Sequence, residues 1–213
     1  MSTITQLHAL RAELTPLGEE PPALVTDFAT GRGQLGRLAV LAAQQQRIIA
    51  SDRRSLLLLA TRCADVPLGA WFAGLADGES AALRTLPALA TACGPAADQQ
   101  PLPGCQAYPS YLAWLALNGH PPAVAAALVA NFTAWGTYCA TLAGALRRFH
   151  AFEEESCAFF DFFAQPATAL EQAAAEAIGP AGLIAPDLDA TREYGRLLQA
   201  YERLFWATLA ELP

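Results

Sequence analysis

Charged residues are scarce in this sequence, and basic clusters are scarcer still. Asp, Glu, Lys and Arg make up 15% of the 213 residues, and the formal net charge is −7. Basic residues are adjacent only in the pairs Arg53-Arg54 and Arg147-Arg148. A protein that binds a phosphate backbone needs a basic face. We therefore expect no nucleic-acid partner.

Residues that ligate metals are also few. The sequence lacks the Glu-x-x-His motifs that a carboxylate-bridged di-iron site takes from two helices, and it has no CxxC pair. We expect no metal site and no cofactor. The five cysteines are interpreted as reduced, mostly buried packing residues. The residues concerned are His8, His120 and His150, and Cys63, Cys93, Cys105, Cys139 and Cys157.

No uninterrupted apolar run approaches the roughly 18 residues that a membrane span requires. The richest run, Ser55 to Ala60, is much shorter, and Met1 to Leu14 carries charges and lacks a signal-peptide core. The prediction is a cytoplasmic protein with no membrane partner. Because 54% of the residues are hydrophobic and charge is sparse, we expect a homo-oligomer, a dimer or tetramer, that hides part of the apolar surface. A monomer with many small alanines on its surface is the alternative.

Strand patterns are absent, since no apolar/polar alternation longer than four residues stands out, and helical periodicity dominates. The sequence predicts an all-α fold of about eight helices, with a single domain over residues 1–213. Loops are expected at 15–22 and 94–104, which are rich in Pro and Gly. A turn at Asp77-Gly78-Glu79-Ser80 is expected to open a helix to Cys93. The remaining helices are predicted over 2–14, 23–30, 35–63, 106–117, 122–149, 153–163, 167–178 and 187–212.

Four aromatic clusters occur at helical spacing. Such stripes are more often core than ligand site, although buried Tyr and Trp need partners for their polar ends. Glu202 lies in the last cluster, and a Glu is rarely buried without a partner or a function. The clusters are Tyr108, Tyr111 and Trp114; Phe132, Trp135 and Tyr138; Phe159, Phe160, Phe162 and Phe163; and Tyr201, Phe205 and Trp206.

Several segments together resemble the TenA/thiaminase II family across nearly the whole chain. They are Ala107-Tyr108 with Tyr111-Leu112, Asn131-Phe132 with Trp135-Gly136, Phe159 to Ala164, and the terminal Tyr201-Glu202-Arg203-Leu204-Phe205-Trp206. The resemblance implies a haem-oxygenase-like helical bundle. Family enzymes cleave thiamin or an aminopyrimidine breakdown product, using a nucleophilic cysteine, a glutamate that moves protons, and an aspartate and tyrosines that orient the substrate.

The resemblance assigns roles to individual residues and also exposes departures. Glu202 matches the proton-transferring glutamate, Tyr108 matches one tyrosine, and Tyr201 belongs to the terminal pattern. Asn131 stands in place of the nucleophilic cysteine, and Gln45 replaces the aspartate. Trp135 and Phe163 replace tyrosines. An amide has no nucleophile comparable to a thiolate but still forms hydrogen bonds.

The function therefore stays open between three hypotheses. The first is a TenA-like protein that binds a small planar heterocycle without thiaminase activity. The second is an enzyme of the same fold with a different reaction, either oxidase-like or with a relocated nucleophile. Cys139 is a poor substitute, because it lies about 12 Å along the helix from Asn131 at 1.5 Å per residue. The third is a regulatory or interaction protein. A pocket predicts a partly buried Glu202 carboxylate and a cavity against Tyr108, Asn131 and Trp135; an interaction protein predicts that those side chains fill this space.

Overall fold

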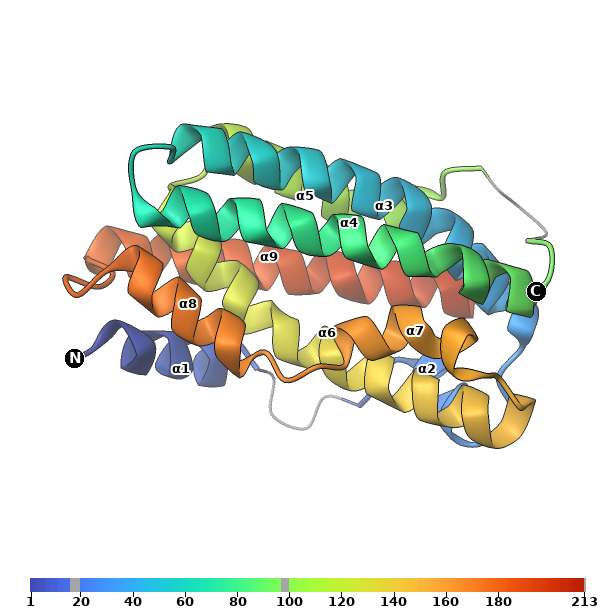
Figure 1. Cartoon of the computed structure of the whole chain (residues 1–213). Coiled ribbons are helices and arrows are strands. Elements are labelled where there is room, and N and C mark those ends of the chain that lie inside the picture. The colour runs from blue at the N-terminus through green and yellow to red at the C-terminus, as the bar shows by residue number, and fades with distance from the viewer. Residues whose placement is uncertain (16–19, 97–99, 213) are drawn as a thin grey trace.

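The computed structural model describes residues 1–15, 20–96 and 100–212. The predicted loops at 15–22 and 94–104 fall partly outside these ranges. The regular structure of the described residues consists of nine α-helices and no strands, which confirms the all-α prediction (Figure 1). The helices are α1 (Thr3–Leu14), α2 (Ala23–Ala29), α3 (Leu35–Arg62), α4 (Pro67–Cys93), α5 (Pro103–Asn118), α6 (Pro121–His150), α7 (Glu154–Phe163), α8 (Thr168–Ile178) and α9 (Ala185–Ala210).

Long helices run side by side and form the body of the molecule. Helices α3 and α4 lie along one side, α9 packs against α5 and α6, and the shorter α1, α2, α7 and α8 cover the opposite side (Figure 1). Proline begins α4, α5 and α6, where its missing N–H costs no helical hydrogen bond. The observed helix ends agree with the predicted ones to within a few residues for all helices except α4.

The predicted turn at Asp77-Gly78-Glu79-Ser80 is wrong. These residues lie inside α4, which is continuous from Pro67 to Cys93. A glycine inside a helix costs about 1 kcal/mol relative to alanine. Packing outweighs this cost, because α4 lies against α3 and α7 and buries Trp71, Phe72 and Ala76. Glu79 consequently projects from a helix rather than from a loop.

Two clusters of buried apolar residues fill the interior. One is built around Phe28, Leu41, Phe159 and Phe160, and the other around Phe72, Leu115 and Leu198. Helix α3 contributes to both, with Ile48 and Ile49 in the first cluster and Leu56 and Leu59 in the second. The middle of α3 therefore marks the junction of the two clusters.

Among the described residues, helix α6 is a candidate membrane span. It alone is long and apolar enough to cross a membrane by length and composition. However, 56% of its apolar window is buried inside the protein, where it contacts α9 and α7. This burial is typical of the central helix of a soluble helical domain.

Candidate functional site

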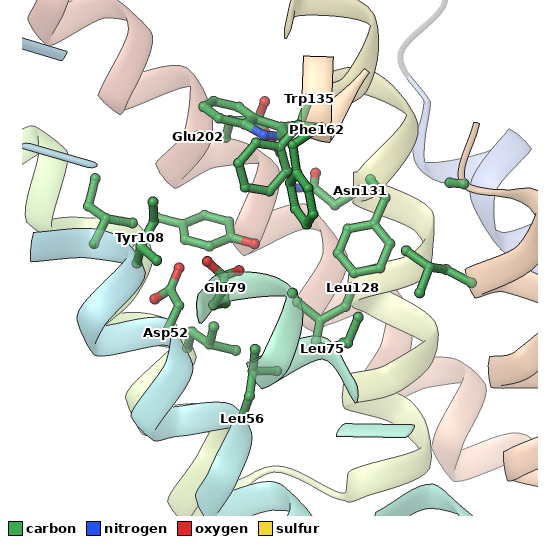
Figure 2. Close-up of a pocket in the computed structure, with 18 of the residues that line it drawn as sticks. Asp52, Leu56, Leu75, Glu79, Tyr108, Leu128, Asn131, Trp135, Phe162 and Glu202 are labelled. Carbon is green, nitrogen blue, oxygen red and sulfur yellow. Dashed lines mark hydrogen bonds between the residues drawn. The ribbon is translucent and has the colours of Figure 1, made fainter. Parts of the chain in front are cut away.

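A cavity of about 430 Å³ lies at the junction of the two apolar clusters. Figure 2 shows side chains from several helices converging on it. Its volume is within the range of small-molecule sites. Most of its lining is apolar. The lining residues are Gln45, Ile48, Ile49, Asp52, Leu56, Gly74, Leu75, Gly78, Glu79, Tyr108, Leu112, Leu128, Asn131, Phe132, Trp135, Phe162, Phe163, Gln165, Pro166, Ala167, Leu170, Glu202 and Phe205.

Aromatic rings form one wall of the cavity. Trp135 of α6 meets the edge of Phe163 of α7 at a centroid distance of 5.8 Å, and it meets Phe205 of α9 at 6.1 Å. Phe162 is 37% exposed and lies at the same wall. Two of the predicted site residues, Trp135 and Phe163, thus lie together at the cavity. Such a wall suits the face or edge of a flat ring.

Glu202 lies in the cavity wall and is held by two donors. Its side chain comes from α9 and the residue is 8% exposed. Asn131 of α6 donates from Nδ2 to Glu202 Oε2 at 2.8 Å, and Trp206 donates from Nε1 to Oε1 at 3.3 Å. The carboxylate position is therefore determined by α6 and by the next turn of α9. Asn131 Oδ1 is buried without a hydrogen-bond partner among the described residues, so its acceptor capacity is unused.

Two further carboxyl groups, which the sequence prediction missed, belong to the same cavity. Asp52 of α3 is 7% exposed, and its Oδ1 has no hydrogen-bond partner among the described residues. Glu79 of α4 lines the cavity beside it (Figure 2). Burial raises the pKa of Glu79 to about 7, and burial together with the charge of Glu79 raises the pKa of Asp52 well above its usual value. Two carboxyl groups in a poorly solvated space cannot both ionise easily.

Tyr108 of α5 lines the cavity together with the carboxyl residues Asp52, Glu79 and Glu202. Figure 2 shows its hydroxyl pointing into the space between Asp52 and Glu79 on one side and Asn131 on the other. Burial and the charges of Asp52, Glu202 and Glu79 raise the pKa of the Tyr108 phenol well above its usual value. The phenol therefore stays protonated and is available as a hydrogen-bond donor.

The other two predicted site residues lie in different places. Gln45 of α3 is 5% exposed and lines the cavity. Tyr201 of α9 does not line it; its ring packs against Tyr111 at a centroid distance of 5.4 Å. Successive side chains on a helix point in different directions, so Tyr201 faces away from the cavity although its neighbour Glu202 faces it. Tyr201 is therefore not a lining residue.

Close helix packing positions the aromatic wall. A Cβ on Gly136 of α6 would lie 2.9 Å from the carbonyl oxygen of Phe163 at the end of α7, so the two backbones approach closely only because residue 136 is glycine. Arg147 of α6 is also hydrogen-bonded to α7. It donates from Nη2 to Asp161 Oδ2 at 2.6 Å and from Nη1 to Asp161 Oδ1 at 3.0 Å. Both contacts hold Phe163 near Trp135.

No cysteine lines the cavity. All five cysteines are described and buried, and all are free. Burial and the charge of Glu202 raise the pKa of the Cys139 thiol well above its usual value, which leaves it a poor nucleophile. The described residues contain no group of three or more His, Cys, Asp or Glu side chains placed to hold a metal ion.

A helical pattern in the sequence could have revealed Asp52. Residues 45, 49, 52 and 56 are spaced four, three and four apart, so they share one face of α3. Gln45 is a candidate site residue and Ile49 and Leu56 are apolar, so Asp52 lies between them on the face that meets the cavity. Glu79 had no such signal, because the glycines of α4 indicated a turn there.

Solved structures with the same fold include several TenA homologues. A domain of unknown function with a haem-oxygenase-like fold from Shewanella denitrificans aligns with a TM-score of 0.75 and 12% identity, covering 97% of this chain and 90% of that one. A TenA homologue from Pseudomonas syringae pv. tomato aligns with a TM-score of 0.72 and 13% identity, covering 99% and 91%. A TenA homologue from P. horikoshii aligns with a TM-score of 0.68 and 15% identity, covering 97% and 98%.

The haem-oxygenase-like, TenA-like fold predicted for this chain is thereby confirmed. Identities of 12–15% establish the fold alone. No protein-family model matches the sequence, and no curated protein matches it. The function must therefore be argued from the cavity.

Proposed function

We propose that this protein binds a small planar heterocycle, of thiamin or aminopyrimidine type, in the cavity lined by helices α3 to α9, and that it does so without thiaminase chemistry. The observation that carries the proposal is a cavity of about 430 Å³ that combines an aromatic wall with buried, incompletely paired acceptors. The hypothesis that these side chains fill the space accounts less well for such a cavity.

The acceptors are suited to a ring that bears amino and N–H groups. Asp52 Oδ1 and Asn131 Oδ1 are both buried and lack partners among the described residues. Leaving a buried acceptor unpaired costs about 1–3 kcal/mol, so a ligand that supplies donors gains this free energy on binding. An aminopyrimidine supplies such donors in the plane of a flat ring, and its faces fit beside Trp135 and Phe163.

The missing thiol supports binding without covalent catalysis. The thiaminase reaction implied by the family resemblance needs a thiolate at the pyrimidine ring, and the cavity offers the amide of Asn131 instead. Cys139, which lies on the same helix as Asn131, does not line the cavity.

One observation favours a second candidate, an acid–base reaction on the bound ring. Glu79 has a pKa of about 7, which is the value expected of a general acid or base that works near neutral pH. A carboxyl group at the cavity wall could move a proton on a ligand without any covalent intermediate. Product analysis separates this candidate from binding alone.

The test is titration calorimetry with thiamin and with its aminomethyl-aminopyrimidine breakdown product, accompanied by mass spectrometry of the mixtures. We expect binding of at least one compound and no thiaminase product. In Glu202→Gln, which puts an amide where Asn131 and Trp206 donate, the affinity should fall by about tenfold or more. Glu193→Gln, an exposed position on the same helix, is the control and should bind normally.

Three results would change the conclusion. Thiaminase turnover would show that a nucleophile acts despite Asn131. A different product from the ring would favour the acid–base reaction. No binding of either compound would contradict the proposed ligand class, and unchanged affinity in Glu202→Gln would contradict the proposed site.

A further inference from the structure

The ionisable groups that line the cavity are acidic. Asp52, Glu79 and Glu202 contribute three carboxyl groups, and no Arg, Lys or His is found among the described residues that line it. Arg53 follows Asp52 in the sequence but points elsewhere, donating from Nε to Ser80 Oγ at 2.8 Å. An anionic ligand would meet only repulsion here, because Coulomb interactions are strong where water is scarce.

The three carboxyl groups differ in how they are satisfied. Glu202 accepts hydrogen bonds from Asn131 and Trp206. Asp52 lines the cavity and is only 7% exposed, and its Oδ1 is buried without a hydrogen-bond partner among the described residues. Buried acids in proteins are normally paired with a cation or hydrogen-bonded. Asp52 and Glu79 are therefore two carboxyl groups in a poorly solvated space with no positively charged partner among the described lining residues.

We infer that the ligand is a small aromatic cation, and that Asp52 and Glu79 receive its positively charged N–H groups while the aromatic wall holds its ring. This inference rests on the proposed function, since it specifies the charge and the orientation of the planar ligand. The chemical class is a flat ring that carries an amidinium, aminopyridinium or similarly protonated nitrogen group.

The surroundings of the pair agree with such a guest. Tyr108 from α5, Asn131 from α6 and Glu202 from α9 face the same space, and all three are neutral or negative (Figure 2). Trp135 and Phe163 present π systems, which attract cations at their faces. Without a cation beside it, Glu79 retains its proton up to about neutral pH, as its raised pKa indicates. An entering cation allows this proton to leave.

Three probes of nearly the same shape test the inference: benzamidine is a cation, benzamide is neutral and benzoate is an anion. Calorimetry at pH 8 should give benzamidine an affinity at least roughly tenfold higher than that of benzamide, as expected for a charge-assisted, two-pronged contact with carboxylates. Benzoate should not bind measurably.

Variants locate the charge preference. In Asp52→Asn the affinity for benzamidine should fall to that of benzamide, while benzamide binding stays the same. Glu79→Gln should reduce the preference in the same direction. Asp65→Asn removes the same charge from an exposed position and should retain the full preference. Circular dichroism melting of each variant verifies that it is folded before titration.

Several outcomes would overturn the inference. These are equal affinities for benzamidine and benzamide, tighter binding of benzoate, binding of none of the probes, or a full cation preference in Asp52→Asn. The proposed function fails separately. If the aminopyrimidine binds but benzamidine is not preferred over benzamide, only the charge inference is wrong. If benzamidine is preferred but neither thiamin nor the aminopyrimidine binds, only the proposed heterocycle is wrong.

Discussion

Two groups of acids in this molecule differ sharply in their surroundings. At the outside of α6 and α7, Asp161 and Glu154 both accept two hydrogen bonds from Arg147. At the cavity, Asp52 and Glu79 have no basic partner among the described lining residues. Arg147 lowers the pKa of Glu154, whereas burial raises the pKa of Glu79 to about 7.

The acids at α6 and α7 have a structural role, whereas the arrangement of the acids at the cavity suits the binding of a ligand. The surface network is satisfied within the chain, so it gains nothing from a guest, and it serves to attach α7 to α6. At the cavity, Asp52 Oδ1 is buried without a hydrogen-bond partner among the described residues, so the folded protein carries a cost there that a suitable ligand would remove. Strongly perturbed acids in a cleft are a physical signal of function.

The largest effect is expected from Glu202→Ala. This change leaves the donors of Asn131 and Trp206 buried without their acceptor and removes side-chain volume next to Phe205. The free energy of unfolding should fall by about 4 kcal/mol. Urea denaturation would measure it, with Glu193→Ala on the exposed side of α9 as the matched control. A loss below about 1 kcal/mol would mean that Glu202 is not the acceptor that holds these donors.

A slightly smaller effect is expected from pH. Folding raises the pKa of Glu79 from its ordinary value of 4.5 to about 7, so the folded protein holds this proton more tightly than the unfolded chain. Its stabilising contribution is complete below about pH 4.5 and is lost as the pH rises through 7. The loss is about 3 kcal/mol, at about 1.4 kcal/mol per pKa unit.

Glu79→Gln removes this titration. Relative to wild type, the variant should therefore gain stability steadily between pH 5 and pH 8 in paired denaturation curves. A difference between the two proteins that does not change with pH would show that Glu79 ionises normally in the folded state.

A moderate effect is expected at the junction of α6 and α7. Gly136→Ala places a methyl group within contact distance of the Phe163 carbonyl, so the end of α7 must shift away from Trp135. The steric cost opposes the higher helix propensity of alanine, and the net loss of stability should be about 1 kcal/mol. Ligand affinity should fall as well. As a control, Gly144→Ala lies on the same helix with open space around its Cβ position and should be neutral or stabilising.

The smallest effect is expected from Arg147→Met in the surface network. Exposed ion pairs contribute little, so the melting temperature should fall by at most roughly 4 °C for a chain of this size. High salt should reduce the difference between variant and wild type. A much larger fall in melting temperature that does not depend on salt would show that this network contributes to stability as a buried one does.

The fold was largely predictable, because helix periodicity and proline or glycine at helix ends are local signals. The exception is α4, where the favourable packing of Trp71 and Phe72 against neighbouring helices is not visible in the local pattern around Gly78. The expectations of a single domain, a cytoplasmic location and a homo-oligomer stay predictions; sedimentation velocity would measure the last.

The site was predictable only in part. Glu202, Tyr108, Asn131, Trp135, Phe163 and Gln45 do line one cavity, and the family resemblance was what singled them out. Tyr201 was included because it belongs to the terminal pattern of the family resemblance, although its ring packs against Tyr111. Asp52 and Glu79 are brought together by the packing of α3 against α4, a long-range contact that no local motif encodes.

The most direct measurement is the pKa of the Glu79 carboxyl group, followed by carboxyl-carbon NMR in the free protein and in the presence of saturating benzamidine. The account predicts a pKa of about 7 in the free protein and a clear fall when the cation occupies the cavity. A pKa near the ordinary value of 4.5 in the free protein, or one that does not change on saturation, would contradict the account of a cavity prepared for a cationic ring.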